Sequence, residues 1–236
     1  MLIPFDRPLL GGRLLRRYKR FLADVLLDDG REATVHCPNT GSMKHCAEPG
    51  SRVWVDLHQR PGRKLPGTWE LVETAPGQLA CVHSSRANAV VAAALAEGLI
   101  APLAHYPDMR REVTLAPGAS RFDFLLGNTE GHCVVEVKSV TLGLGGGEGA
   151  FPDAVSVRGQ KHLRELTALA QAGQRCCLLF CVMHSGIDRV RPADEIDPVY
   201  GQLVREARAA GVLVLAWSVR PTPLGLEVAG ELPVYC

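Results

Sequence analysis

The chain has 236 residues, of which 47% are hydrophobic and 22% charged, and its formal net charge is +1. These values are typical of a folded globular protein with one large or two modest domains, and they exclude a polycationic chain. No stretch reaches the roughly 18 consecutive apolar residues of a membrane span, and the N-terminus lacks the basic and long apolar segments of a signal peptide. We therefore expect a cytoplasmic protein with no membrane partner.

The eight cysteines of the chain include no CxxC pair. Several of them lie in or beside apolar runs, where a free cysteine packs as a small hydrophobic side chain. We expect reduced, structural thiols rather than disulfides or a zinc site.

The charge is divided unevenly near residue 84. Residues 1–83 hold 12 Lys and Arg against 9 Asp and Glu, or +3, and residues 84–236 hold 14 against 16, or −2. Within the first part, a cationic run with an interleaved tyrosine suits a phosphate backbone and a stacked base. We expect nucleic-acid contacts from the cations of this run, Arg16, Arg17, Lys19 and Arg20. A solvated charged face is the alternative.

The first part has turn-forming residues at 28–30, 38–41, 48–51 and 60–67. Short strands punctuated in this way predict a small barrel. Residues 13–27 also fit helical spacing, so periodicity by itself favours a helix there.

The second part alternates helices and strands. After Ser84 or Ser85, which could cap a first helix, the predicted elements are strands at about 111–115, 121–126 and 133–140, a helix at about 155–172, a strand at 176–183, a helix at about 197–210 and a strand at 212–219. This order predicts an α/β domain with a mixed sheet covered by helices.

The glycine-rich segment at 143–149 lies where a phosphate-binding loop would lie, but it has neither a Gly-Lys-Ser/Thr ending nor a dinucleotide fingerprint. We interpret it as a flexible connector. Asp153, which follows a proline, could be a metal ligand, and we favour a role in capping or leading into the next helix.

The segment RFDFLLGNTEGHCVVEVKSV at 121–140 predicts a hairpin of two apolar strands that nevertheless contain three charges. Folding about the centre of its turn sets Asp123 opposite Glu136, and directly opposed side chains have Cβ atoms roughly 4.5 to 5.5 Å apart. Lys138 projects to the same face as Glu136, because side chains alternate along a strand. The three charges should therefore share one small area.

Two carboxylates this close repel each other, and burying them without partners is costly. A divalent cation removes this objection, because Asp and Glu oxygens are preferred ligands of Mg²⁺. A lysine beside the ion can position or deprotonate the attacking water and balance charge on a phosphate. The alternative is a simple ion pair at a sheet edge.

The helix at 155–172 buries a stripe of leucines and turns its polar residues to another face. If it packs beside the hairpin, its first turns could bring Gln160, and Lys161 or His162, to the carboxylates and Arg158 to a phosphate.

Four motifs resemble the sugar fermentation stimulation protein A (SfsA) family. They are CPNTGSM at 37–43, SRFDFLL at 120–126, EVKSVTL at 136–142 and VRGQKHL at 157–163. The resemblance implies DNA binding, an OB-like barrel in residues 1–83 and a PD-(D/E)xK nuclease-like mixed-sheet α/β domain in residues 84–236. It also favours strands over a helix at 13–27.

The nuclease pattern is carried over only where residues match. Asp123 is similar to the Asp of the motif, with Phe122 in the place of its proline, and Glu136-Val137-Lys138 matches the (D/E)xK element. The resemblance implies that Asp123 and Glu136 hold Mg²⁺ or Mn²⁺ and that Lys138 serves the attacking water. Glu112, or less favourably Glu97, would add an acid, and Gln160 would support the site. The expected nucleic-acid contacts of this domain are Arg121, Arg158, Lys161 and His162.

Two functions are compatible with these residues. The first is a Mg²⁺- or Mn²⁺-dependent phosphodiesterase that cuts DNA or RNA. The second is a non-enzymatic DNA-binding regulator of genes for carbohydrate metabolism, of the maltose type. The sequence contains no helix-turn-helix or zinc finger for reading bases, which favours the first.

Overall fold

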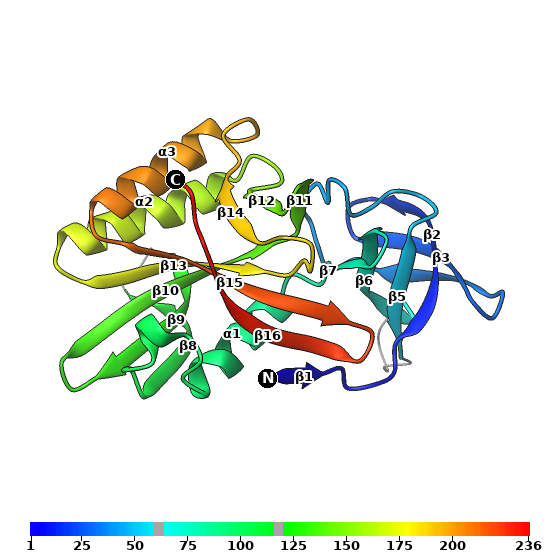
Figure 1. Ribbon diagram of the computed structural model, residues 1–236, viewed down its shortest axis with the longest axis horizontal. Coiled ribbons are helices and arrows are strands. Elements are labelled where there is room, and N and C mark those ends of the chain that lie inside the picture. The colour runs from blue at the N-terminus through cyan, green and yellow to red at the C-terminus, as the bar shows by residue number, and fades with distance from the viewer. Residues whose placement is uncertain (59–63, 116–119) are drawn as a thin grey trace.

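The computed structural model describes residues 1–58, 64–115 and 120–236. A barrel lies at one end of the molecule and a larger domain of strands and helices at the other (Figure 1). The Pro/Gly-rich loop expected at 60–67 falls partly outside the described residues.

Five strands build the barrel of the first domain. They are β2 (Leu10–Tyr18), β3 (Leu22–Leu27), β4 (Glu32–His36), β5 (Arg52–Leu57) and β6 (Gly67–Ala75). The order β4-β3-β2-β5-β6 closes on itself because His36 of β4 pairs with Thr68 of β6. A short strand, β7 (Gln78–Cys81), pairs antiparallel with β6 and leads toward the second domain. The expected barrel is confirmed.

Residues 13–27 form two strands, so the helical periodicity is misleading. The turn between β2 and β3 places Lys19 and Arg20 at positive φ, 47° and 65°, which reverses the chain within a few residues. Leu14 and Val25 point into the barrel and are fully buried. Closing the barrel buries one face of each strand, and this tertiary burial outweighs local spacing.

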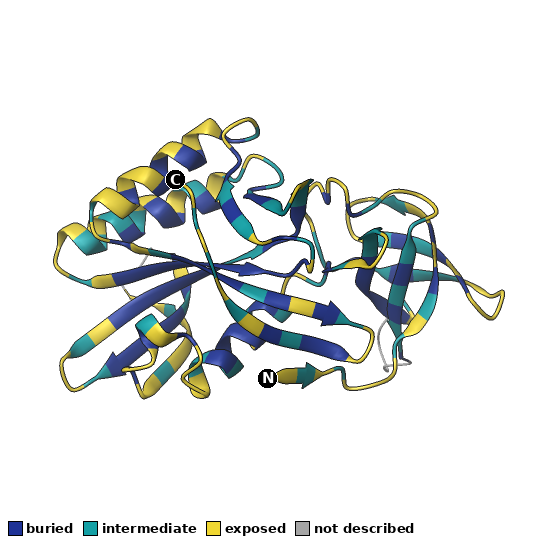
Figure 2. Cartoon of the chain, in the orientation of Figure 1, coloured by how far each residue is buried: buried dark blue, intermediate teal, exposed yellow. Residues whose placement is uncertain are grey.

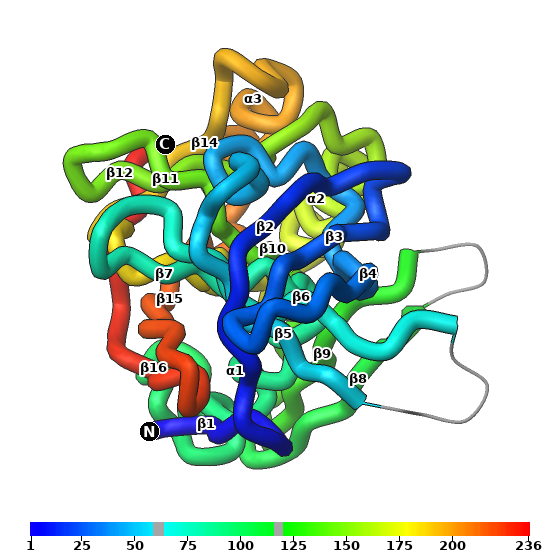
Figure 3. Tube along the Cα trace, turned by 90° about the vertical axis from the view of Figure 1, so that its right-hand side faces the viewer, coloured from blue at the N-terminus to red at the C-terminus, as the bar shows by residue number. Residues whose placement is uncertain are grey.

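A seven-stranded mixed sheet forms the second domain. Its order is β1-β16-β15-β13-β10-β9-β8, with β10, β13 and β15 parallel. The strands are β1 (Leu2–Pro4), β8 (Asp108–Thr114), β9 (Arg121–Asn128), β10 (Gly131–Val140), β13 (Arg175–Val182), β15 (Leu213–Thr222) and β16 (Gly225–Leu232). Figure 3, which looks from the barrel end, shows β1 beside β16. The first residues of the chain thus join the second domain, although the sequence groups them with the barrel.

Helices cover both faces of this sheet (Figure 1). α1 (Arg86–Ala96) packs on one face, and α2 (Val157–Gln171) and α3 (Pro198–Ala209) pack on the other. Ser156 caps α2 and Asp197 caps α3 through their side-chain oxygens. Figure 2 shows the central strands almost wholly buried between the two layers. The helices and strands expected in this part are present, with β14 (Arg189–Pro192), β16 and a short 3₁₀ turn (Ala101–Leu103) in addition.

The glycine-rich segment is a hairpin and not the expected connector. β11 (Leu142–Gly145) pairs with β12 (Glu148–Phe151), which in turn pairs with β14. Gly145, Gly146 and Gly147 have φ of 88°, 57° and 82°, values that L side chains rarely adopt. The glycines therefore serve a tight turn.

The cysteines are free thiols, and all but Cys236 are buried. This agrees with the structural role expected from sequence. Within the described ranges, no helix is long and apolar enough to cross a membrane.

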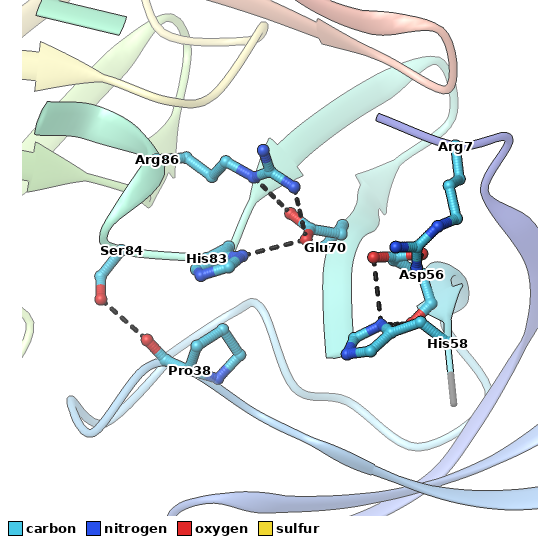
Figure 4. A network of polar contacts seen from close by, with 8 residues as sticks. All are labelled: Arg7, Pro38, Asp56, His58, Glu70, His83, Ser84 and Arg86. Carbon is cyan, nitrogen blue, oxygen red and sulfur yellow. Dashed lines mark hydrogen bonds and ion pairs between the residues drawn. The ribbon is translucent and has the colours of Figure 1, made fainter. Parts of the chain in front are cut away.

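A buried ionic cluster joins the barrel to α1 (Figure 4). The carboxylate of Glu70, on β6, accepts hydrogen bonds from Arg86 at 2.9 and 3.0 Å and lies 3.0 Å from Nδ1 of His83. Nearby, the Ser84 hydroxyl donates to the carbonyl of Pro38 at 2.8 Å. Glu70 is only 1% exposed, so these contacts hold the start of α1 firmly against the barrel.

Candidate active site

The predicted hairpin is formed by β9 and β10. Their antiparallel register runs from Asn128↔Gly131 to Phe124↔Val135. Beyond this point the Val137 N–H donates to Oδ2 of Asp123 at 2.7 Å, so a side-chain carboxylate takes over as the acceptor for β10. Asp123 is therefore fixed beside the stretch of β10 that carries Glu136 and Lys138.

Glu136 lies in a buried polar cluster. Its Oε1 accepts from Nζ of Lys138 at 2.5 Å and contacts Nδ1 of His162, which comes from α2. Both Glu136 and His162 are 3% exposed. Oε2 of Glu136 is also buried, and it has no hydrogen-bond partner in the described part of the chain. A buried carboxylate oxygen without a partner is costly and therefore points to a missing ligand.

Asp123 is held by α1 as well as by β10. The amide Nδ2 of Asn88, on α1, donates to Oδ1 of Asp123 at 2.6 Å. Burial, followed by the nearby negative charge of Glu136, raises the pKa of Asp123 above its ordinary value. The two carboxylates thus interact electrostatically, as like charges in a small site do.

Glu136 is shifted in the opposite direction. Burial would raise its pKa, but the hydrogen bond from His162 and the charge of Lys138 outweigh burial and lower the pKa. Glu136 is therefore kept ionised while Asp123 takes up a proton more readily. A pair of carboxyl groups with diverging pKa values is typical of functional sites.

A cavity of about 270 Å³ opens beside Lys138, between the two domains. Its walls include Asn39 and Thr40 of the barrel domain, Asn88 of α1, and Ser139 of β10. The cavity reaches Lys138 and the two groups that bond Asp123, which are Asn88 and the backbone of Val137, whereas Asp123 and Glu136 themselves are not part of its lining.

Asp123 and Glu136 have carboxylate oxygens with free lone pairs, which are the ligands that a divalent cation requires. Each oxygen of Asp123 accepts one hydrogen bond and retains a lone pair, and Oε2 of Glu136 accepts none. No group of three or more His, Cys, Asp or Glu residues that could hold a metal occurs among the described residues. Mg²⁺ and Mn²⁺ bind through as few as one or two carboxylates and complete their shells with water and phosphate, so Asp123 and Glu136 are the residues that could hold such an ion.

Glu112 does not join the carboxylates as expected. It lies opposite Asp123, between the pairs Arg111↔Phe124 and Val113↔Phe122. Its backbone has φ of 54°, and its carboxylate forms an ion pair with Nε of Arg121 at 2.7 Å. The irregular backbone turns the side chain toward an exposed cation. The weaker candidate, Glu97, lies at the C-terminal end of α1.

Of the α2 residues expected at the carboxylates, His162 reaches Glu136 and Gln160 does not. Gln160 donates to the carboxylate of Asp197 at 3.0 and 3.2 Å and so supports the start of α3. His162 lies against Glu136, which is one of the two positions expected for it, and its burial leaves no surface for the other, the contact with nucleic acid. Residues two positions apart on a helix point to nearly opposite sides, so only one of the two can face the strand, and the sequence alone does not identify which one.

The cations at 16–20 are largely occupied within the protein. Arg17 donates to the carbonyls of Asn39 and Gly41, each at 2.9 Å, and Arg20 donates to the carbonyl of Thr40. Arg16 forms an ion pair with Asp24 at 2.7 Å. Arg17 therefore has a structural role that charge counting missed.

The other expected cations lie on the surface. Lys19 is exposed on the β2–β3 turn and has no ion-pair partner among the described residues. Arg158 and Lys161 are exposed on α2, where Lys161 lies 3.6 Å from Glu165.

Sequence reasoning missed two further parts of the site. Asn88 holds Asp123 from α1, and no spacing rule indicates this contact. Asp153 accepts a hydrogen bond from the Met43 N–H at 2.8 Å and so links the two domains. The capping role expected of Asp153 belongs to Ser156.

The fold and the site define a two-domain protein in which an OB barrel precedes a mixed-sheet α/β domain that carries two carboxylates and a lysine. A family model described as "SfsA N-terminal OB domain" matches residues 15–82, and one described as "Sugar fermentation stimulation protein RE domain" matches residues 85–225. The chain belongs to the sugar fermentation stimulation protein (SfsA) family.

Individual proteins support the same assignment. The sugar fermentation stimulation protein homolog of Pseudomonas aeruginosa strain PAO1 is 55% identical over 231 residues and covers 98% of both chains. The homolog of Alkalilimnicola ehrlichii is 52% identical over 235 residues, or 98% of this chain and 99% of that protein. The structure of Pyrococcus furiosus SfsA in complex with Ca²⁺ matches with a TM-score of 0.89 and 27% identity, over 99% of this chain and 98% of that one.

Proposed function

We propose that the chain is a divalent-metal-dependent phosphodiesterase that cuts DNA or RNA, with its second domain resembling the PD-(D/E)xK nucleases. The observation that carries this proposal is the buried Oε2 of Glu136, which has no hydrogen-bond partner among the described residues although Asp123 and Lys138 are near Glu136. Leaving a buried carboxylate oxygen without a partner costs about 1 to 3 kcal/mol, and a bound cation would offset this cost.

Each residue of the cluster has a distinct task in this proposal. Asp123 and Glu136 would hold Mg²⁺ or Mn²⁺, which supplies Lewis-acid activation of a phosphate oxygen and of water. Lys138 holds Glu136 and lines the cavity, where the remaining N–H donors of its ammonium group would orient water and stabilise a phosphate. Asn88 and His162 keep the two carboxylates in place.

The metal has indirect support from a relative. The SfsA protein of Pyrococcus furiosus forms a complex with Ca²⁺. Ca²⁺ and Mg²⁺ are both hard cations that bind oxygen ligands. The same chemistry is available to Asp123 and Glu136.

Nucleic acid would be held by the surface cations. Lys19, Arg158 and Lys161 are exposed and can contact phosphates, with Arg16 and Arg121 contributing from their ion pairs. Arg20 also has an exposed guanidinium, although it bonds the carbonyl of Thr40. Such contacts would add affinity without reading sequence.

The test is a cleavage assay with purified protein. Single- and double-stranded DNA and RNA are incubated with Mg²⁺, with Mn²⁺ and with a chelator, and Asp123→Ala and Lys138→Ala are compared with the wild type. Glu206→Ala, which changes an exposed carboxylate on α3, is the matched control. We expect metal-dependent cleavage by the wild type and the control only.

Equal cleavage by the wild type and both site variants would indicate a contaminating nuclease. Binding without any cleavage would instead favour the alternative, a non-enzymatic DNA-binding regulator of carbohydrate-metabolism genes. In that case affinity should fall steeply with salt and survive Asp123→Ala.

A further inference from the structure

We propose that the cavity between the domains binds one unpaired nucleotide next to the phosphate that is cut, and that the barrel domain builds one wall of this pocket. The inference rests on the proposed phosphodiesterase function and names its substrate as a single strand or a frayed end. It assigns a function to the CPNTGSM segment at 37–43, which has no role in the proposed reaction of the carboxylates.

The segment is anchored from its own domain through its backbone. Arg17 donates to the carbonyls of Asn39 and Gly41 at 2.9 Å and to that of Ser42 at 3.4 Å. Arg20 donates to the carbonyl of Thr40. A surface loop rarely receives so many side-chain donors, and here they fix the course of four successive residues.

The second domain holds the same segment from the other side. The carboxylate of Asp153 accepts from the Met43 N–H at 2.8 Å, and the Ser42 hydroxyl donates to the Asp153 carbonyl at 2.5 Å. A Cβ atom added at Gly41 would lie 2.7 Å from both carboxylate oxygens of Asp153, so only glycine permits this approach. The segment is therefore a rigid bridge between the domains.

This anchoring leaves the side chains of the segment available to a ligand. Oδ1 of Asn39 accepts from the Gly41 N–H at 2.8 Å, and its Nδ2 forms no hydrogen bond with the described residues. Thr40 is exposed, and its hydroxyl has no hydrogen-bond partner in the described part of the chain. Both residues line the cavity, so their donors are directed to whatever enters it.

The opposite wall carries matching donors. Lys138, Ser139 and Asn88 line it, and the Asp153 carboxylate in the lining is already bound to the bridge. Amide, hydroxyl and ammonium donors suit the oxygens of a phosphate and a sugar. Val137 and Asn88 also line the cavity and both donate to Asp123, so an occupant is separated from this carboxylate by the residues that hold it.

The size of the cavity limits the occupant. Its volume is about 270 Å³, slightly below the range of roughly 300 to 1,000 Å³ for small-ligand pockets. One nucleotide is a ligand of this size, whereas a base pair is not. An enzyme that must take up a base in a pocket acts on single strands or pays to unpair the duplex.

The test measures binding in an Asp123→Asn background, so that no cleavage occurs. The probe is a fluorescein-labelled oligothymidylate, alone or annealed to its complement, followed by fluorescence anisotropy. Thr40→Trp fills the mouth of the pocket and Ser139→Ala removes one donor, while Leu224→Trp, at a site 76% exposed in the β15–β16 turn, is the control. Thermal melting checks that each variant is folded.

We expect Thr40→Trp to weaken single-strand binding by about tenfold, equivalent to about 1.4 kcal/mol, and Ser139→Ala to weaken it by a smaller factor. The duplex should bind more weakly than the single strand, and neither substitution should change its affinity. Equal single-strand affinity for Thr40→Trp and Leu224→Trp would overturn the pocket.

A second measurement separates the pocket from the proposed reaction. Thymidine 5′-monophosphate is titrated into the ¹⁵N-labelled wild type, and the amide signals of Gly41 and Ser139 should shift. Shifts without cleavage under any metal would support the pocket and refute the phosphodiesterase. Metal-dependent cleavage that is lost in Asp123→Ala but unaltered in Thr40→Trp would refute the pocket and support the phosphodiesterase.

Discussion

Arg158 donates from Nε to Nε2 of His162, one turn further along α2, with the two nitrogens 3.4 Å apart. A guanidinium is only a donor, so Nε2 of His162 acts as the acceptor and the imidazole carries its proton on Nδ1. That proton is directed to Oε1 of Glu136. An exposed arginine thus sets the tautomer of a buried histidine, which in turn orients a carboxylate of the site.

His162→Ala should lower the free energy of unfolding by about 1 to 3 kcal/mol, because Glu136 loses a buried donor. His162→Asn, whose amide can donate from nearly the same position as Nδ1, should recover part of the loss. Urea unfolding at neutral pH measures both, and His132→Ala, at an exposed position in β10, is the control. Unchanged stability in His162→Ala would show that Glu136 does not depend on this hydrogen bond.

Lys138→Met should reduce cleavage by about 10²- to 10³-fold, the usual effect of removing one donor that stabilises developing charge. The same change removes a cation that lowers the pKa of Glu136, so this pKa should rise. Lys138→Arg keeps the charge but not the compact shape of the ammonium, and it should recover binding more than rate. Single-turnover cleavage with Mg²⁺ measures the rates. A Lys138→Met rate close to that of the wild type would contradict a role in the reaction.

Contacts between residues close in sequence could be predicted, whereas contacts between distant parts of the chain could not. The turn at 127–132 and the strand alternation led directly to the grouping of Asp123, Glu136 and Lys138. The contact of Asn88 with Asp123 joins residues 35 positions apart through a helix-to-sheet packing that no local pattern encodes.

The errors have similar physical causes. Residues 13–27 have helical spacing but form strands, because closing the barrel buries Leu14 and Val25. The glycines at 145–147 suggested a loose connector because their need for positive φ is shared by loops and tight turns. Arg17 appeared to be a surface cation because carbonyl oxygens from a distant loop cannot be counted in a charge pattern.

Glu70→Gln should destabilise the protein by about 1 to 3 kcal/mol near neutral pH, because Arg86 and His83 lose a buried charged partner (Figure 4). Burial opposes ionisation of Glu70, but His83 and Arg86 outweigh it and lower its pKa. Its ionised form therefore adds stability above the unfolded pKa of about 4.3, and this is lost as pH falls through the lowered value.

Denaturant unfolding of the wild type and Glu70→Gln across this pH range checks the linkage. The difference between them should shrink toward acid pH. Glu73→Gln, on the same strand but half-buried, should show little difference at any pH. A gap between wild type and Glu70→Gln that widens on acidification would contradict the assigned direction.

Divalent metal binding should strengthen as pH rises, because burial and the charge of Glu136 raise the pKa of Asp123. In the metal-free protein a raised carboxyl pKa means that stability falls as pH rises through the folded pKa, since the folded state binds the proton more tightly. A bound cation offsets this loss of stability, because it pairs with the ionised carboxylate of Asp123. The melting-temperature increase caused by Mn²⁺ should therefore grow between about pH 4 and pH 8, and Asp123→Asn should abolish it. An increase independent of pH, or retained in Asp123→Asn, would place the metal elsewhere.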